Sequence, residues 1–233
     1  MEDMIRLLVL LGILAFIPLC TGVADEPAPV APLSDAISLP PPEMEGPLSL
    51  EEAIAARRSI RSYSSEPLST ADLSSLLWAA QGITNPNRGY RAAPSAGALY
   101  PLEVTVAIGD VEGIAPGTYR YHPDGHRITL IEAGDHRSAL SAAAVGQQSV
   151  ADAPVTLVIS GVYDRLRVRY GDRGERYTIL EGGHVSQNCY LIATSRGLGT
   201  VAVGAFDDRA VQEAMGLPAD ETPLYLMPVG RIG

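Results

Sequence analysis

The chain contains no lysine, since all 17 of its basic residues are arginine. A phosphate-binding P-loop requires a lysine, and Schiff-base or pyridoxal phosphate chemistry requires a lysine amine as nucleophile. Both classes of enzyme are therefore excluded. The 27 acidic residues outnumber the basic ones, for a formal charge of -10, and no basic run occurs. Because affinity for nucleic acid comes largely from cationic side chains, no nucleic-acid partner is expected.

Cysteine and dinucleotide-binding motifs are also scarce. Only Cys20 and Cys189 are present, so no disulfide is expected within the main domain, and Cys189 has the setting of a buried small hydrophobe. His122 and His126 are four residues apart, but Pro123 and Gly125 between them indicate a turn, which rules out a helical zinc site. No G-x-G-x-x-G occurs, so any redox cofactor is expected to be a mononucleotide.

The N-terminal 47 residues differ in composition from the rest. Residues 7–19 form an apolar run after Arg6, and Gly22 and Ala24 are small residues of the kind that signal peptidases read. Residues 1–24 are therefore expected to be a signal peptide or membrane anchor, with an exported or membrane-anchored domain outside the cytoplasm. Residues 25–47 are rich in proline and predict an extended linker, which leaves residues 48–233 as one domain.

Alternating helix and strand signals fill residues 48–233. Ser49 and Glu52 form a capping-box pattern for a helix that reaches about Arg58, and Ser69 to Asp72 repeats that signal before an apolar stripe. A long helix is expected from about Tyr177 to Gly197, and a short one stopped at Gly216. Strands are expected at residues 102–108, 119–121, 128–131, 155–159, 200–203 and 224–229. This mixture predicts an α+β sandwich.

Three segments carry residues suited to ligand binding. Arg57, Arg58, Ser59 and Arg61 follow a predicted helix, and closely spaced guanidiniums and hydroxyls suit a phosphate. The alternative is a helix C-terminus stabilised by cations. Small residues at Pro94, Ser95, Ala96 and Gly97 allow backbone to approach a flat ligand. The glycines Gly182 and Gly183, near the expected entrance of the long helix, offer free N–H groups and close approach to an anionic or electron-accepting ring edge.

Ser95 also invites a second interpretation. The segment around it resembles a nucleophile elbow with alanine at the first glycine position, and His184 is available as a base. A serine hydrolase using Ser95 is therefore an alternative. An elbow requires a strand before the serine and a helix after it, whereas the residues before Ser95 read as loop and a strand begins near Pro101. His184 has its own alternative, as a helix residue that satisfies a buried partner.

The ordered set of motifs resembles the nitroreductase superfamily, in the SagB-type dehydrogenase branch that includes azoline oxidases of thiazole and oxazole peptide biosynthesis. The resemblance covers residues 39–231. The segments that carry it are Leu39-Pro40-Pro41-Pro42, Arg57-Arg58-Ser59-Ile60-Arg61, Leu76-Leu77-Trp78-Ala79-Ala80-Gln81-Gly82, Ala93-Pro94-Ser95-Ala96-Gly97, Tyr170-Gly171-Asp172-Arg173-Gly174, Gly183-His184-Val185-Ser186-Gln187-Asn188 and Gly197-Leu198-Gly199-Thr200.

The resemblance implies an FMN-dependent oxidoreductase, with a mixed or antiparallel sheet flanked by helices and a homodimer that holds the flavin where its subunits meet. The substrate would be a small molecule or peptide-derived, and a nicotinamide donor is possible. By carry-over, residues 57–59 and Arg61 would hold the phosphate end, residues 94–97 the isoalloxazine ring, and Gly182 and Gly183 its reactive nitrogen. Gly204 and Arg231 would lie near the phosphate.

One position departs from the family. Azoline-oxidising members carry a Lys-Tyr pair proposed as catalytic base, and the matching residues here are Arg169 and Tyr170. Arginine stays protonated in proteins and does not readily accept a proton. Arg169 and Tyr170 are therefore the catalytic candidates, with Tyr170 as a proton donor, and a protein that binds flavin without turnover is the alternative.

Overall fold

The computed structural model describes residues 36–233. The expected signal peptide or anchor, residues 1–24, and the first part of the expected linker lie outside the described residues. Among residues 36–233, no helix has the length and apolar character needed to cross a membrane.

A seven-stranded sheet forms the centre of the domain, in the order β1-β6-β5-β4-β7-β9-β8, and every neighbouring pair is antiparallel. The strands are β1 (Ala36–Ser38), β4 (Leu102–Ile108), β5 (Gly117–His122), β6 (Arg127–Ala133), β7 (Val155–Gly161), β8 (Leu198–Thr200) and β9 (Thr222–Arg231). A separate hairpin pairs β2 (Ile83–Asn85) with β3 (Tyr90–Arg91). All seven residues of β7 are buried, as expected for a strand covered on both faces.

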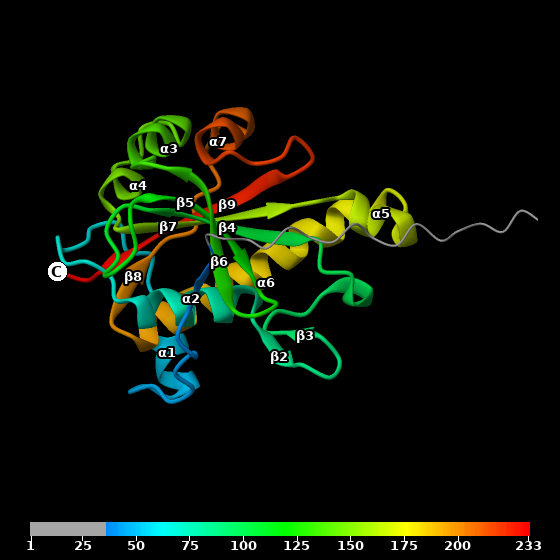
Figure 1. Ribbon diagram of the computed structural model, residues 1–233. Coiled ribbons are helices and arrows are strands. Elements are labelled where there is room, and N and C mark those ends of the chain that lie inside the picture. Colours follow the sequence, from blue (N-terminus) through cyan, green and yellow to red (C-terminus); the bar gives the residue numbers. More distant parts are fainter. Residues whose placement is uncertain (1–35) are drawn as a thin grey trace, which may run out of the picture. The chain divides into compact units, whose positions relative to one another are not determined.

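Helices cover both faces of this sheet (Figure 1). On one face lie α1 (Leu50–Ala56), α2 (Thr70–Gln81) and α6 (Arg173–Ser195), and on the other α3 (Arg137–Ala143), α4 (Gln148–Asp152) and α7 (Asp208–Met215). The short helix α5 (Asp164–Tyr170) precedes α6, and one 3-10 turn, η1 (Ala96–Ala98), precedes β4. The α+β sandwich with flanking helices is confirmed.

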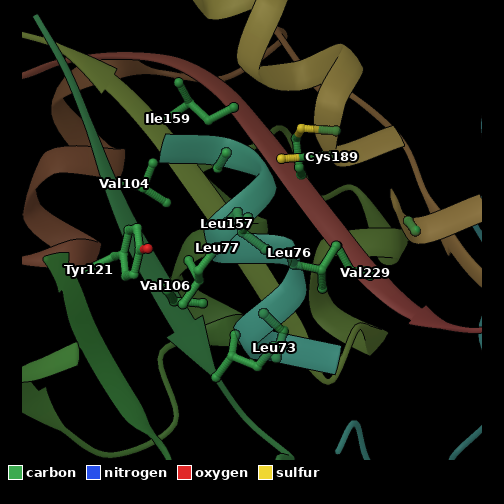
Figure 2. Packing of buried hydrophobic residues seen from close by; sticks show 14 of the residues in the cluster. Leu73, Leu76, Leu77, Val104, Val106, Tyr121, Leu157, Ile159, Cys189 and Val229 are labelled. Atoms are coloured by element: carbon green, nitrogen blue, oxygen red, sulfur yellow. The ribbon is translucent and has the colours of Figure 1, made fainter. Parts of the chain in front are cut away.

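Two hydrophobic clusters hold these layers together. Figure 2 shows the larger one, in which Leu73, Leu76 and Leu77 of α2 pack on Val104 of β4 and Leu157 of β7. Alternate residues of the same strands point the other way, where Ala107 and Val158 meet α3, α4 and α7 in the second cluster. This alternation follows from the two-residue period of a strand.

Local signals placed most of the elements. Ser49 accepts from the Glu52 N–H and donates its own backbone N–H to the Glu52 carboxylate, which confirms the capping box. Ser69 caps α2 with one of the two capping-box hydrogen bonds, in which its hydroxyl oxygen accepts from the Asp72 N–H. The Asp72 carboxylate accepts from the Ser69 hydroxyl and not from the Ser69 backbone N–H. Gly216 ends α7 with φ of 61°.

Three expectations were wrong. The domain begins before residue 48: β1 pairs with β6, Leu39 is buried, and the Ser74 hydroxyl donates to the Pro40 carbonyl, so residues 36–47 are part of the fold. The strand expected at residues 200–203 is β8, which ends at Thr200. The long helix α6 begins at Arg173, so Gly182 and Gly183 lie in its interior and not at its entrance.

Candidate functional site

The arginine-rich segment after α1 runs beside the edge strand β8. The Ile60 N–H donates to the Thr200 carbonyl at 2.9 Å, and Ser59 forms a parallel bridge with Thr200. This placement brings the Ser59 hydroxyl to 3.0 Å from the Tyr190 hydroxyl of α6, and the Arg57 guanidinium to 5.0 Å from the Tyr190 ring centroid. Tyr190 therefore anchors the segment to the long helix.

The charges of this segment are not neutralised within the described part of the chain. Arg57, Arg58 and Arg61 form no ion pair with any carboxylate of residues 36–233, whereas seven other arginines do. Arg58 instead donates to the carbonyls of Ala55 and Arg57. Guanidiniums without carboxylate partners are suited to a phosphate, so Arg57, Arg58 and Arg61 remain candidates to bind one.

The loop of residues 94–97 is held by a buried carboxylate on α6. Glu181 Oε1 accepts from the Ala96 N–H at 2.7 Å and from the Ser95 hydroxyl at 3.1 Å. Burial raises the pKa of Glu181, although these two hydrogen bonds and the nearby His184 oppose the shift. A hollow of about 300 Å³ opens beside the loop and is lined by Pro94, Ser95, Ala96, Tyr177, Leu180, Glu181 and His184.

The surroundings of Ser95 do not form a hydrolase site. Its hydroxyl donates to Glu181 and accepts from the Tyr100 N–H at 2.9 Å, so its proton is directed at a carboxylate and not at His184. Ser95 is followed by the single turn η1 and then by β4, in place of the helix that a nucleophile elbow needs. The interpretation of Ser95 as an elbow nucleophile is wrong.

Arg169 and Tyr170 end α5 and lie against the same loop. A Cβ placed on Gly97 would be 2.7 Å from the Tyr170 hydroxyl and 2.8 Å from Arg169 Nη1. Gly97 has φ of 63°, a left-handed backbone conformation that favours glycine, whereas the two nearby atoms are the ends of flexible side chains. Tyr170 is supported by an edge-to-face contact with Tyr177, at 5.2 Å between ring centroids.

The two glycines of α6 have different surroundings. Because they are in a helix interior, their N–H groups belong to the helical hydrogen-bond pattern and are not the free donors expected from the sequence. A Cβ on Gly182 would lie 3.2 Å from the Leu224 side chain, so Gly182 permits close packing. Gly183 is exposed, and a Cβ there would meet nothing within 4 Å.

The two remaining candidates lie at different points along β9. Gly204 is exposed, and a Cβ there would lie 3.7 Å from the Tyr225 ring. Arg231 Nη2 donates to Asp72 at 2.9 Å, and its Nε lies 3.7 Å from Glu66. Two carboxylates thus neutralise this guanidinium, which favours a structural role for Arg231 over the phosphate role expected for it.

The predicted residues fall into two groups joined by α6. The arginine group meets α6 at Tyr190, while the loop of residues 94–97 and the Arg169–Tyr170 pair meet it around Glu181. Gly183 and Tyr190 are seven residues apart, which places them on the same helix face, about 10 Å apart along the axis. This distance separates Tyr190, which contacts the arginine segment, from Gly183, which is exposed.

Sequence reasoning missed the residues that organise both groups. The sequence motifs assign no role to Glu181 or Tyr190, and they assign Asp72 only to helix capping. Their partners are 85, 131 and 159 residues away in the chain, in Ala96, Ser59 and Arg231. The position of Glu181 directly before the candidate glycines Gly182 and Gly183 is the signal that could have identified it.

Comparisons with known proteins identify the family of this chain. Residues 54–231 match the nitroreductase family. A protein of Methanocaldococcus jannaschii named as a nitroreductase is 46% identical over 199 residues, which cover 85% of this chain and 98% of the relative. The microcin B17-processing protein McbC of Escherichia coli is 28% identical over 155 residues, covering 64% of this chain and 57% of McbC.

A solved structure shows the same architecture. The crystal structure of a Ralstonia eutropha protein described as a nitroreductase has a TM-score of 0.75 and 32% identity, with 88% of this chain and 92% of that one covered. The match to McbC agrees with the resemblance to SagB-type dehydrogenases. Since the family match spans most of the described domain, the chain belongs to the nitroreductase family.

Proposed function

We propose that this protein is an FMN-dependent oxidoreductase that transfers hydride between the flavin and a small organic or peptide-derived substrate. The observation that carries the proposal is the set of three guanidiniums, Arg57, Arg58 and Arg61, without carboxylate partners among residues 36–233. Of the three, Arg57 lies 5.0 Å from the ring centroid of Tyr190, which is seven residues from the open position at Gly183 on α6.

The residues present fit a flavin mononucleotide. The arginine segment supplies cationic forks for the phosphate, and the Ser59 hydroxyl is held at its edge by Tyr190. Gly183 has no side chain and meets nothing at its Cβ position, which leaves room for a flat ring against the helix. FMN, when bound, would supply the hydride chemistry, and the protein would supply binding, orientation and electrostatics.

The other residues of the site position the Pro94–Gly97 loop or supply charge and a proton beside it. Glu181 fixes the Pro94–Gly97 loop through two hydrogen bonds and thereby sets one wall of the hollow beside it. The Tyr170 hydroxyl lies beside Gly97, next to the loop residues that line the hollow, and can donate a proton to a reacting group bound against that loop. Arg169 keeps its proton and cannot serve as the base, so its role is electrostatic.

We also propose a homodimer and a nicotinamide electron donor. The support for the dimer is the family resemblance and the exposure of apolar side chains on the helices that carry the site, with Leu50 at 61%, Ile54 at 55% and Leu180 at 53%. The named role of McbC in processing microcin B17 supports a peptide-derived substrate. Sedimentation equilibrium of the full chain tests the dimer.

Flavin binding is the first experiment. The full chain, purified and supplemented with FMN, is expected to retain flavin absorption bands after gel filtration, and Arg57→Gln is expected to weaken FMN binding by about tenfold or more. Arg209→Gln is the matched control, because Arg209 is an exposed arginine of α7 paired with Glu213. Absence of bound flavin in the wild-type protein under all reconstitution conditions would contradict the proposal.

Anaerobic titration with NADH or NADPH then separates two functions. Bleaching of the flavin bands would establish a reductase. The second candidate, a protein that binds flavin without turnover, is favoured by arginine at position 169 where related azoline oxidases have a lysine. It predicts a bound flavin that neither nicotinamide donors nor reduction by dithionite followed by an electron acceptor can cycle.

We further propose that the domain is exported or held at a membrane by its N-terminal segment. The support is the apolar run of residues 7–19 in the sequence. A fusion of residues 1–47 to alkaline phosphatase tests this in a bacterial host, because the enzyme is active only after export. An inactive fusion would contradict the proposed location without bearing on the flavin chemistry.

A further inference from the structure

Two hydrogen-bond donors of α5 converge on one point beside the Pro94–Gly97 loop. Arg169 Nη1 and the Tyr170 hydroxyl lie 2.8 and 2.7 Å from the position that a Cβ on Gly97 would occupy. Arg169 also lies 5.6 Å from the Tyr170 ring centroid, so the guanidinium and the phenol form one unit. The glycine at position 97 keeps this point free of a side chain.

Arg169 differs from its neighbours in charge compensation. The preceding arginines of α5 are neutralised, Arg165 by Glu103 and Arg167 by Asp164 and Glu175. Arg169 is exposed and forms no ion pair with a carboxylate of residues 36–233. An available guanidinium presents a planar fork that matches an anionic oxygen pair, and a neighbouring O–H adds a third donor.

We propose that the substrate carries a carboxylate, which the Arg169 guanidinium and the Tyr170 hydroxyl bind at the edge of the hollow lined by Pro94, Ser95, Ala96 and Tyr177. This inference rests on the proposed function, since it assigns the class of substrate for that site. Arginine at position 169, where azoline oxidases have a lysine, would then bind the substrate carboxylate and would not act as a base. The phosphates of a nicotinamide donor share this anionic chemistry and are the second source that the experiment separates.

Equilibrium binding tests the anchor without catalysis. Isothermal titration calorimetry of the oxidised full-chain protein compares benzoate with benzamide, which have similar shapes and differ in charge. Wild type is expected to bind benzoate at least about tenfold more tightly, and Arg169→Gln to lose that preference. Arg169→Lys is expected to retain part of it, because the charge remains while the fork is lost. Equal affinities for both probes in wild type, or no benzoate binding, would overturn the inference.

The control variant is Arg176→Gln. Arg176 is also exposed and forms no ion pair among the described residues, but it lines a different hollow, with Asp172, Glu175, Ile179 and Leu180. It is expected to keep the benzoate preference. A loss in Arg176→Gln equal to that in Arg169→Gln would mean that general surface charge attracts the anion, and would overturn the assigned role of Arg169.

A single-turnover experiment distinguishes the proposed oxidoreductase activity from the proposed carboxylate binding by Arg169. The flavin of the FMN-loaded protein is reduced with dithionite, and its reoxidation is followed with 4-nitrobenzoate or 4-nitrobenzamide. Wild type is expected to favour 4-nitrobenzoate by about tenfold or more and Arg169→Gln to favour neither. If both acceptors react equally in wild type, the oxidoreductase stands and the carboxylate inference fails. If neither reacts, the proposed function fails, while the calorimetry still measures the anchor.

A comparison of nicotinamide donors tests whether Arg169 binds a phosphate of the donor and not a carboxylate of the substrate. Reduction by NADPH and by NADH is compared in wild type and Arg169→Gln. An unchanged ratio of the two rates supports a substrate carboxylate at Arg169. A selective loss of reduction by NADPH, with unchanged preference for 4-nitrobenzoate, would assign Arg169 to the donor phosphate and overturn the proposal.

Discussion

The substitution Gly183→Ala is expected to stabilise the protein and to weaken its binding of FMN. Gly183 is in the interior of a 23-residue helix, where glycine is about 1 kcal/mol less favourable than alanine. A Cβ at this position meets nothing within 4 Å, so no clash offsets the gain in helix propensity. The unliganded variant should therefore be more stable by about 1 kcal/mol, or roughly 2–4 °C in Tm for a domain of this size.

The same Cβ would stand where the proposed flavin ring lies against the helix. We expect Gly183→Ala to raise the Kd for FMN by about tenfold, equivalent to ~1.4 kcal/mol. Urea unfolding with and without FMN measures both effects, and the chain's single tryptophan, Trp78 on α2, supplies the fluorescence signal. The opposite signs of the two effects distinguish contact with a ligand from general damage to the fold.

Gly182→Ala is the matched control. Its Cβ would lie 3.2 Å from the Leu224 side chain, so the adjustment of that side chain opposes the gain in helix propensity. Little or no stabilisation is expected. If Gly183→Ala destabilises the unliganded protein, the open space at that position is refuted. If it is stabilised but binds FMN with unchanged affinity, the ring does not lie at Gly183.

Other contacts give further predictions. Glu181→Ala should lower the free energy of unfolding by about 2 kcal/mol in urea titrations, because two donors of the Pro94–Gly97 loop lose their acceptor. Burial raises the pKa of Glu181 in the folded protein. The stabilisation linked to this pKa shift is full below about pH 4.3 and is lost as pH rises through the raised pKa. Glu181→Gln should abolish this part of the pH dependence of unfolding. Glu221→Ala removes both acceptors of Arg120, at 2.7 and 2.8 Å, and should cost about 3 kcal/mol in the same assay. Burial raises the pKa of the Cys189 thiol to about 12, so iodoacetamide should label it in urea and not in the native protein, as measured by peptide mass.

The elements that sequence reasoning placed well are those with local signals. The strand at residues 102–108 was predicted with the bounds that β4 has, because its apolar run is bounded by Pro101 and Gly109. The helix that ends at Gly216 was predicted from a glycine at the position where a left-handed cap is needed. The bounds of this strand and the end of this helix are both set by residues adjacent in the sequence.

The errors arose where distant contacts decide the structure. Residues 36–38 become a strand because β6 pairs with them from about 90 residues away, as in the register Ile37 to Ile128. Proline-rich composition favoured an extended linker over this pairing, and it gave no sign that the Pro40 carbonyl accepts from the Ser74 hydroxyl. Two adjacent glycines suggested a helix entrance, but packing of α6 against α2 and the sheet carries the helix through them.

The helix α6 explains why one element can serve both parts of the candidate site. Its buried residues, among them Val185 and Cys189, fix it against the sheet and thereby fix the direction of its other faces. One of these faces presents Glu181 to the Pro94–Gly97 loop, and another carries Tyr190, which contacts the arginine segment, and the exposed Gly183. Gly182 has a packing reason in Leu224, whereas Gly183 has none among the described residues. Glycine costs stability in a helix interior without such a reason, and the opposite effects expected of Gly183→Ala on stability and on FMN affinity test whether a ligand approaches the helix at this position.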